Sequence, residues 1–292
     1  MLRNILFVIG ELDHYEQLAE TIMALAAEWT GSAACFVRVA LEKEYPACLM
    51  EWHMEINDTI VVTDRAELAR KAAAKSQAVV AVLTEKNRNA SFGGVMFAIE
   101  GIQNPGMDYF EKVYGRCHGI PWTILETDRC LVREIQLEDL DRLYEIYAEP
   151  SITQYMEGLY EDRAEEEQYT RDYIRNMYGF YGYGMWVVEE KKSHRLIGRA
   201  GIESGDSEET AELGYLIAKE YQRQGYATEV CEAIIKYAGD KLEFKRIVCY
   251  VEPENEASRM LCRRLGLTER EEKVRKGKRY CFYEKEFMKE FS

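Results

Sequence analysis

Several common functional signatures are absent from this chain of 292 residues. No apolar run approaches the roughly 18 residues of a membrane-spanning helix, and the run at residues 5–9 is too short for a signal-peptide core. The eight cysteines form no Cys-x-x-Cys pair, and the four histidines lack the spacing of metal ligands. We therefore expect a soluble, cytoplasmic protein with reduced thiols, no metal site and no membrane partner.

A basic stripe of the kind that binds nucleic acid is also absent. The net charge is −14, and the basic residues near 263–264 and 273–279 are interleaved with glutamates. These basic residues are typical of a solvated surface, so we expect no nucleic-acid partner. An acidic protein can still attract a cationic amine substrate.

The length favours two domains, and a hydrophobic content of 47% is sufficient for packed cores. Glycine and proline punctuate the chain near residues 119–122. We therefore place one domain at residues 1–122 and a second at 128–292. No internal repeat or low-complexity tract interrupts either of them.

Strand and helix patterns alternate in the first domain. Apolar runs at 5–9, 35–39, 59–63 and 79–83 predict strands, and the periodicity at 15–29 and 65–75 predicts helices. This alternation indicates a small, Rossmann-like parallel sheet. Asp64 stands where a helix cap would stand, and residues 87–106 are predicted to be a loop.

Residues 61–64, with the helix and strand that follow, vaguely resemble the last βαβ unit of haloacid-dehalogenase-like phosphatases. That family needs an Asp-x-Asp motif after its first strand, and residues 10–13 read Gly-Glu-Leu-Asp instead. The resemblance therefore implies a degenerate domain that is not hydrolytic. The role of this domain stays open.

The most informative segment is Gln-Arg-Gln-Gly-Tyr-Ala at residues 222–227. A strand-like run precedes it, and a helical pattern of apolar residues follows from 227 to 238. A strand, a glycine loop and a helix in this order direct backbone N–H groups and the helix dipole at one anion. The segment is neither a P-loop nor a dinucleotide fingerprint, because it lacks both Gly-Lys-Ser/Thr and G-x-G-x-x-G.

The pattern Gln222-x-x-Gly225-x-Ala227 resembles the acetyl-CoA pyrophosphate loop of the GNAT superfamily of N-acetyltransferases. The pair Asn255-x-x-Ser258, with the apolar residues after it, resembles the later helix that flanks the cofactor in that superfamily. The resemblance covers residues 128–292 and implies an α+β domain with a mixed, splayed sheet. Residues 131–135 and 225–229 look most like the RimJ/RimL branch, which acetylates protein N-termini. The alternative for the loop is an ordinary βα turn.

The elements expected in this domain follow the order of the family. Strands are predicted at 130–135, 185–189, 195–203, 209–217, 246–251 and 278–287, and helices at 137–147, 161–178, 227–238 and 257–265. Aromatic residues crowd residues 155–160 and 178–186. They either shape the acceptor site, as the resemblance implies, or pack in the core.

The resemblance implies acetyl-CoA or coenzyme A as the cofactor. It assigns the cofactor-binding role to Gln222, Arg223, Gln224, Gly225, Tyr226, Ala227 and Thr228 at the pyrophosphate, to the backbone of Leu216 and Ile217 along the pantetheine arm, and to Asn255 and Ser258 on its other side.

The proposed reaction requires a proton acceptor, because α-amino and lysine groups have pKa values near 8 and 10.4 and are mostly protonated in a cell. Glu212, on the strand before the loop, is the candidate base, with a solvent-facing strand residue as the alternative and Glu203 in reserve. Many family members place a proton-donating tyrosine seven residues after the asparagine matched to Asn255. Cys262 stands there, so it is either the candidate acid or a packed core thiol. Ser258, Tyr280 and Tyr283 are the other candidates for the acid.

The leading hypothesis is an acetyl-CoA-dependent N-acetyltransferase that modifies a primary amine, either a protein N-terminus or a small molecule. A non-catalytic acetyl-CoA-binding sensor is the alternative. A bifunctional chain with a hydrolytic first domain is disfavoured by the missing nucleophile motif. The first domain is left with substrate selection, regulation or formation of a homodimer as its candidate roles.

Overall fold

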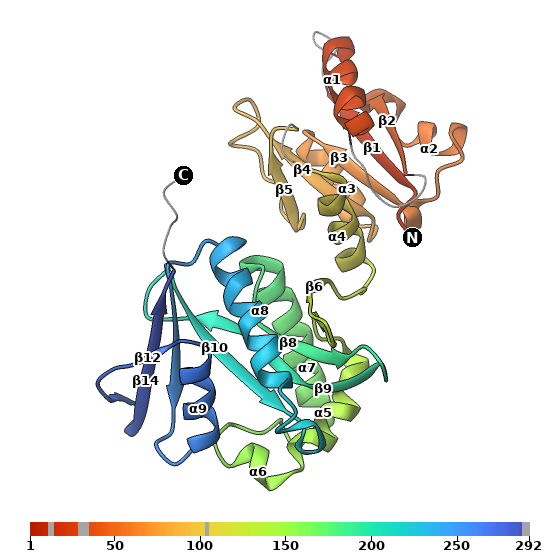
Figure 1. The fold of residues 1–292 in the computed structure, drawn as a ribbon. Helices are drawn as coiled ribbons and strands as arrows, with labels where there is room; N and C mark the ends of the chain where they lie inside the picture. Colours follow the sequence, from red (N-terminus) through yellow and green to blue (C-terminus); the bar gives the residue numbers. More distant parts are fainter. Residues whose placement is uncertain (11–14, 29–34, 103–104, 288–292) are drawn as a thin grey trace. The chain divides into compact units, whose positions relative to one another are not determined.

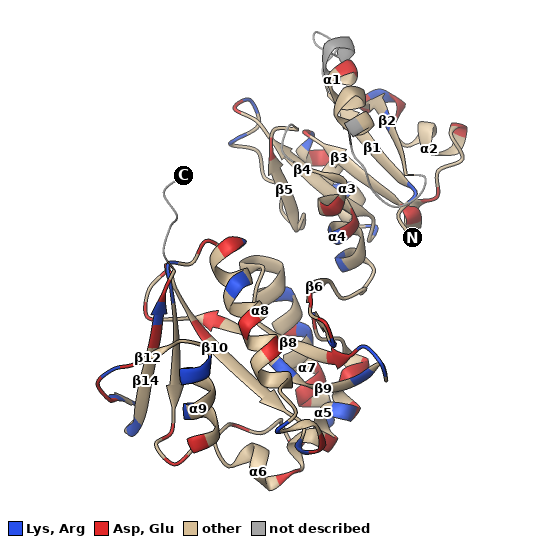
Figure 2. Cartoon of the chain, viewed as in Figure 1, with Lys and Arg blue, Asp and Glu red and all other residues tan. Residues whose placement is uncertain are grey.

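The computed structural model describes residues 1–10, 15–28, 35–102 and 105–287, and divides the chain into two compact units at Ile120 and Pro121. Figure 1 shows the elements of each unit. In the described residues no helix is long and apolar enough to cross a membrane. Lys and Arg are interspersed with Asp and Glu over the described parts of both units (Figure 2).

The N-terminal unit is a parallel sheet between helices. Its strands are β1 (Asn4–Ile9), β2 (Phe36–Leu41), β3 (Thr59–Thr63), β4 (Ala78–Leu83) and β5 (Phe97–Glu100), and its helices are α1 (Tyr15–Glu28), α2 (Ala47–Glu51), α3 (Ala66–Ala73) and α4 (Met107–Cys117). The strands run parallel in the order β2-β1-β3-β4-β5. One core joins the sheet to α1 and α4, and a second core joins its other face to α2 and α3. The predicted parallel α/β fold is confirmed.

Two local predictions in this unit are wrong. Residues 87–106 were predicted to be a loop, but they contain the edge strand β5. Asp64 does not cap α3: no side chain caps that helix, and the Asp64 carboxylate instead accepts a hydrogen bond from the Gly10 N–H at 3.3 Å. Trp29, at the end of the predicted first helix, lies outside the described residues.

The C-terminal unit is built on a mixed sheet. Its strands are β6 (Thr123–Glu126), β7 (Cys130–Arg133), β8 (Met185–Glu190), β9 (Arg195–Ser204), β10 (Thr210–Ile217), β11 (Arg246–Val251), β12 (Thr268–Glu269), β13 (Lys273–Arg275) and β14 (Lys278–Glu286). Its helices are α5 (Leu140–Tyr147), α6 (Pro150–Thr153), α7 (Arg163–Tyr173), which continues as a π-helix over Ile174–Tyr181, α8 (Tyr226–Asp240) and α9 (Glu256–Arg264). The sheet order is β12-β14-β11-β10-β9-β8-β7-β6, with β13 paired to β14.

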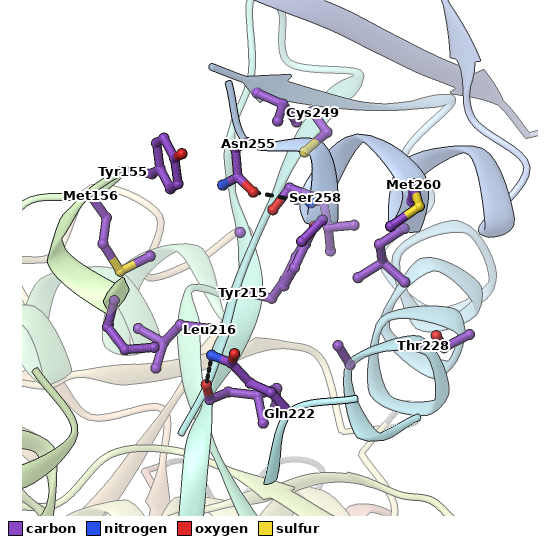
Figure 3. Close-up of a pocket in the computed structure, with 18 of the residues that line it drawn as sticks. Tyr155, Met156, Tyr215, Leu216, Gln222, Thr228, Cys249, Asn255, Ser258 and Met260 are labelled. Atoms are coloured by element: carbon purple, nitrogen blue, oxygen red, sulfur yellow. Dashed lines mark hydrogen bonds between the residues drawn. The ribbon is translucent and has the colours of Figure 1, made fainter. Parts of the chain in front are cut away.

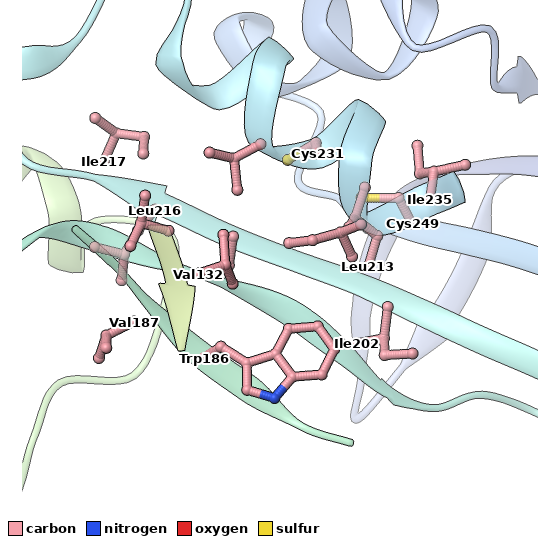
Figure 4. Close-up of a cluster of buried hydrophobic side chains, with 14 of the residues drawn as sticks. Val132, Trp186, Val187, Ile202, Leu213, Leu216, Ile217, Cys231, Ile235 and Cys249 are labelled. Carbon is pink, nitrogen blue, oxygen red and sulfur yellow. The ribbon is translucent and has the colours of Figure 1, made fainter. Parts of the chain in front are cut away.

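The core of this unit lies between α8 and the sheet. Figure 4 shows Cys231 and Ile235 of α8 above the strands, with Leu213, Ile202 and Trp186 in the same cluster. These apolar residues are buried because α8 presents them at spacings of three and four to strands whose side chains alternate between faces. This packing fixes the first turn of α8 beside the end of β10.

The sheet splays at one place, and this opening creates the site. Strands β10 and β11 are parallel and pair only from Thr210 to Glu212 on the β10 side. Beyond Glu212, β10 continues to pair with β9 as far as Ile217, and β11 continues to pair with β14 as far as Val251. Over the length of the opening, the facing edges of β10 and β11 therefore do not pair with each other. The predicted mixed, splayed sheet is confirmed.

Candidate functional site

A pocket with a volume of about 880 Å³ occupies the opening between β10 and β11. Its walls come from the α6 region, β10, the loop before α8, the first turn of α8, β11 and α9. Figure 3 shows Tyr155 and Met156 on one side of the pocket, and Asn255 and Ser258 on the other. The volume is in the usual range of small-molecule and cofactor sites.

The loop before α8 is folded by two left-handed residues. The φ angles of Arg223 and Gly225 are 62° and 85°. Gln222 ties the loop back to β10, because its side-chain amide donates a hydrogen bond to the Ile217 carbonyl at 2.9 Å (Figure 3). Gly225 is the residue before the first turn of α8, and no side chain caps that helix. Its first N–H groups are therefore available to an anion, which the positive end of the helix dipole also attracts.

A brace behind the loop holds this geometry. The Arg129 guanidinium forms an ion pair with Glu229 at 2.6 Å, donates to the Gln224 carbonyl at 3.0 Å and lies 4.1 Å from the centre of the Tyr226 ring. Burial alone would raise the pKa of Glu229, but hydrogen bonds from Thr127 and Arg129 lower it. The brace was not predicted, since Arg129 and Glu229 are 100 residues apart in the sequence.

Most of the predicted cofactor-binding residues line the pocket: Leu216, Ile217, Gln222, Arg223, Gly225, Tyr226, Ala227, Thr228, Asn255 and Ser258. Gln224 is outside that lining; its side-chain amide donates to the Glu220 carbonyl at 2.7 Å. Asn255 also caps α9, because its side-chain oxygen accepts a hydrogen bond from the Ser258 N–H at 3.1 Å.

Two arginines are part of the pocket lining. Arg223 and Arg264 both belong to the lining, and neither forms an ion pair in the part of the chain that the structure describes. Unpaired guanidinium groups beside an uncapped helix favour a polyanionic ligand. The sequence pattern predicted Arg223 but gave no indication of Arg264.

Cys262 does not reach the pocket. It is fully buried on α9, and its thiol shares a hydrogen bond with that of Cys249, which does line the pocket. This burial favours the packed core thiol over the proton donor, and a role of Cys262 as the acid stays a prediction. Of the other candidates, Ser258 and Tyr280 line the pocket, whereas Tyr283 is fully buried.

Carboxylates and tyrosines also line the pocket, and we call the part that they form the acceptor end: Tyr155, Glu212, Tyr250, Glu252 and Tyr280. Glu212 forms an ion pair with Arg275 at 2.7 Å, and Glu252 forms one with Lys278 at 3.0 Å. Glu203 lies directly opposite Glu212 on β9. Glu203 is exposed at the surface, but partial desolvation of its carboxyl, and then the Glu212 carboxylate, raise its pKa.

The aromatic residues of the two segments lie in different environments. Tyr155 lines the pocket, as one of the two interpretations predicted. Tyr178 and Trp186 are fully buried in the core, as the other predicted. Tyr160 and Phe180 are exposed and lie outside the pocket lining. In the described ranges no group of three His, Cys, Asp or Glu residues is placed to hold a metal.

The C-terminal unit is similar to known acetyltransferases. Residues 129–268 match the acetyltransferase (GNAT) domain family. The uncharacterized N-acetyltransferase YoaA of Bacillus subtilis is 30% identical over 147 residues, which cover 49% of this chain and 81% of YoaA. The uncharacterized N-acetyltransferase p20 of Bacillus licheniformis is 30% identical over 139 residues, covering 46% of this chain and 76% of p20.

The chain belongs to the GNAT acetyltransferase family. The fold agrees with that of an apo structure of RimL, a ribosomal L7/L12 alpha-N-protein acetyltransferase, with a TM-score of 0.50 and 15% identity over 57% of this chain and 95% of that one. The chain is an acetyltransferase, and its cofactor is acetyl-CoA. The pocket fits this cofactor in its chemistry, because its lining combines the uncapped start of α8, two arginines without an ion pair in the described residues and the edge of β10 that β11 leaves unpaired.

Proposed function

We propose that this chain transfers the acetyl group of acetyl-CoA to a primary amine by direct attack, with Glu212 as the general base. One observation carries the proposal: a single pocket joins the uncapped first turn of α8 to the Glu212 carboxylate through the β10–β11 opening. An anion-binding end and a proton-accepting end thus face the same cavity.

The cofactor-binding roles follow from this layout. Backbone N–H groups from Arg223 to Thr228 would hold the pyrophosphate, and the free edge of β10 at Leu216 and Ile217 would pair with the amides of the pantetheine arm. Asn255 and Ser258 would contact the arm from α9. Bound acetyl-CoA supplies the acetyl group as a thioester.

We assign the role of proton acceptor to Glu212. The amine nitrogen must lose a proton as it attacks, and Glu212 is the carboxylate at the last paired residue before the opening. A thiolate is a tolerable leaving group, so no acid is required in place of Cys262. Ser258 and Tyr280 line the pocket and are the hydroxyl groups that could donate to the departing sulfur.

The acceptor is either a protein N-terminus or a small amine. Residues 131–135 and 225–229 favour the RimJ/RimL branch, and RimL, whose fold this unit shares, is a ribosomal L7/L12 alpha-N-protein acetyltransferase. Substrate selection, regulation and dimerisation stay the candidate roles of the N-terminal unit. A cytoplasmic location and a homodimer stay predictions from the sequence.

The test of this function is the variant Gly225→Glu. Its added carboxylate would stand at the mouth of α8, on a residue whose φ of 85° suits glycine, and would repel the pyrophosphate. We expect coenzyme A affinity to fall by at least about 100-fold in calorimetry, since both a charge and a steric block are introduced. Release of free thiol from acetyl-CoA with short peptides, a diamine and free amino acids would fall in parallel.

Gly182→Glu is the matched control, because Gly182 also has a left-handed φ, 76°, and open space around its Cα. It adds the same charge and the same backbone strain outside the pocket lining, so it should bind coenzyme A normally. Equal losses in both variants would contradict the proposed loop. Tight binding by the unmodified protein without turnover of any amine would instead support the sensor alternative.

A further inference from the structure

The carboxylate proposed as the base is held by a residue that the pocket lining does not include. The Arg275 guanidinium contacts Glu212 at 2.7 Å between Nη1 and Oε2, although the two residues are 63 positions apart. No other hydrogen bond or ion pair to Glu212 is present within the described residues. The Oε2 atom is therefore occupied, and Oε1 is left for a proton.

The hairpin that carries Arg275 has a well-defined geometry. Strand β13 pairs with the beginning of β14, and Arg275 is opposite Lys278 across a two-residue turn. The turn residues, Lys276 and Gly277, both have left-handed φ angles, 47° and 79°. Two left-handed residues match the twist of the flanking strands, so the turn fixes the position of the hairpin tip.

A second contact restrains the Arg275 side chain. Its guanidinium lies over the Tyr250 ring, 3.4 Å from the ring centre, and Tyr250 lines the pocket. The Tyr250 ring in turn meets that of Tyr280 edge to face, at 6.4 Å and 89°. Arg275 thus touches two residues of the acceptor end at once. A guanidinium can satisfy both contacts because it is charged and also planar. An ammonium group is charged but not planar.

The charges around Glu212 show what Arg275 contributes. Glu203 faces it from β9, Cys249 from β11 and Arg275 from β13. The negative charge of Asp206 also attracts the Arg275 guanidinium, and the positive charge of Arg199 attracts the Glu203 carboxylate. Among these groups Arg275 is the cation in direct contact with Glu212. Without it, Glu212 would face the like charge of Glu203 with no counter-ion at contact distance.

We propose that Arg275 is a positioning residue for acetyl transfer: its guanidinium, stacked on Tyr250, holds Oε2 of Glu212 and fixes the rotamer of the carboxylate, so that Oε1 accepts the proton of the acceptor amine. The inference rests on the proposed function. In the balanced step, the acceptor first releases one proton to water and attacks as the neutral amine. Its nitrogen bonds to the acetyl carbon, the carbon–sulfur bond breaks, the thiolate leaves with the electron pair, and the one proton that the nitrogen still loses to become an amide passes to Glu212.

The test compares Arg275→Gln with Arg279→Gln. Both remove one positive charge from the same hairpin, but Arg279 is 76% exposed and pairs only weakly with Glu272, at 3.9 Å. The pH dependence of kcat and of KM is measured at saturating acetyl-CoA, with the amine from the panel that the unmodified protein acetylates fastest. The same amine is used throughout, so its own titration is common to all variants.

In Arg275→Gln we expect the acidic limb of the kcat profile to move to higher pH, because the variant removes the positive charge that contacts the proposed base. We expect kcat at pH 7 to fall by about tenfold while coenzyme A affinity in calorimetry is unchanged. Arg275→Lys should restore the limb but only part of kcat, since lysine restores the charge without the stacking. Arg279→Gln should match the unmodified protein.

An unmoved acidic limb in Arg275→Gln, or an equal shift in Arg279→Gln, would overturn the inference. Retained coenzyme A binding shows that a variant is folded, and Arg275→Lys provides a second measurement if Arg275→Gln is not. If the unmodified protein acetylates no amine, the proposed function fails and this inference fails with it. Turnover with identical profiles would overturn the inference alone.

Discussion

At the scale of single residues, Tyr215 shows how a pocket wall can contain an unsatisfied group. Its hydroxyl is buried without a hydrogen bond of acceptable geometry in the described residues, although Ser258 lies close to it. A buried hydroxyl without a partner costs folding free energy, because water no longer solvates it. We therefore expect Tyr215→Phe to leave the free energy of unfolding unchanged, or to raise it by up to about 1 kcal/mol.

Tyr178→Phe is the matched comparison, because the Tyr178 hydroxyl donates to the Met185 carbonyl at 2.5 Å and accepts from the Ile135 N–H at 3.4 Å. Removing it leaves two buried backbone groups with one partner fewer, so we expect a loss of about 1–2 kcal/mol. Urea unfolding without cofactor measures both variants. Equal losses would show that the Tyr215 hydroxyl also makes a stabilising contact.

The residues of the site divide by how far apart their partners are in the sequence. Gln222, Gly225 and Asn255 could be predicted because a strand, a loop and a helix that are consecutive in the sequence place them together. Arg129 and Arg275 could not be predicted, because each acts through a contact made only when distant strands are brought together. A surface arginine and an arginine that braces a pocket look the same in one sequence.

At the scale of elements, pattern length decided what could be predicted. Strand β11 and helix α8 have long apolar patterns and were predicted within a few residues. Strands β12 and β13, with two and three residues, are too short to show an alternation, and the pairing with β14 defines them. Strand β5 has four residues inside a glycine-rich stretch and was missed for the same reason.

The pairing of β9 with β10 includes a charge repulsion whose effect on the free energy of folding depends on pH. Glu203 and Glu212 are directly opposite, and like charges in this position destabilise a sheet. Partial desolvation of its carboxyl and the charge of Glu212 raise the pKa of Glu203 in the folded protein. Because the folded-state pKa is above the unfolded value, folding is favoured when Glu203 is protonated, and that contribution is lost as the pH rises through the folded pKa.

We therefore expect Glu203→Gln to raise the free energy of unfolding at pH 7, by a few tenths to about 1 kcal/mol. The gain should shrink toward zero below about pH 4, where the native carboxyl is also neutral. Urea unfolding at several pH values measures this difference. Glu208→Gln is the control, since Glu208 is exposed and forms no ion pair in the described residues. A gain in Glu203→Gln that persists at low pH would contradict the charge argument.

At the scale of the whole molecule, the two units have separate cores. The N-terminal unit has one core on each face of its parallel sheet, and the core of the C-terminal unit lies around α8. The pocket that we propose for acetyl-CoA is lined only by residues from the range 151–280. A ligand stabilises the cooperative unit that binds it, by about 2.7 kcal/mol at a free concentration 100 times its Kd.

We therefore expect calorimetry to show two unfolding transitions, of which acetyl-CoA raises only one. Phe110→Ala identifies the other, because Phe110 is fully buried in the N-terminal unit and truncation of such a side chain costs about 3–5 kcal/mol. In this variant the transition that does not respond to ligand should move to lower temperature, while coenzyme A affinity stays the same. A single transition that shifts with both the ligand and the variant would contradict this expectation. It would show that the two units unfold together as one cooperative unit.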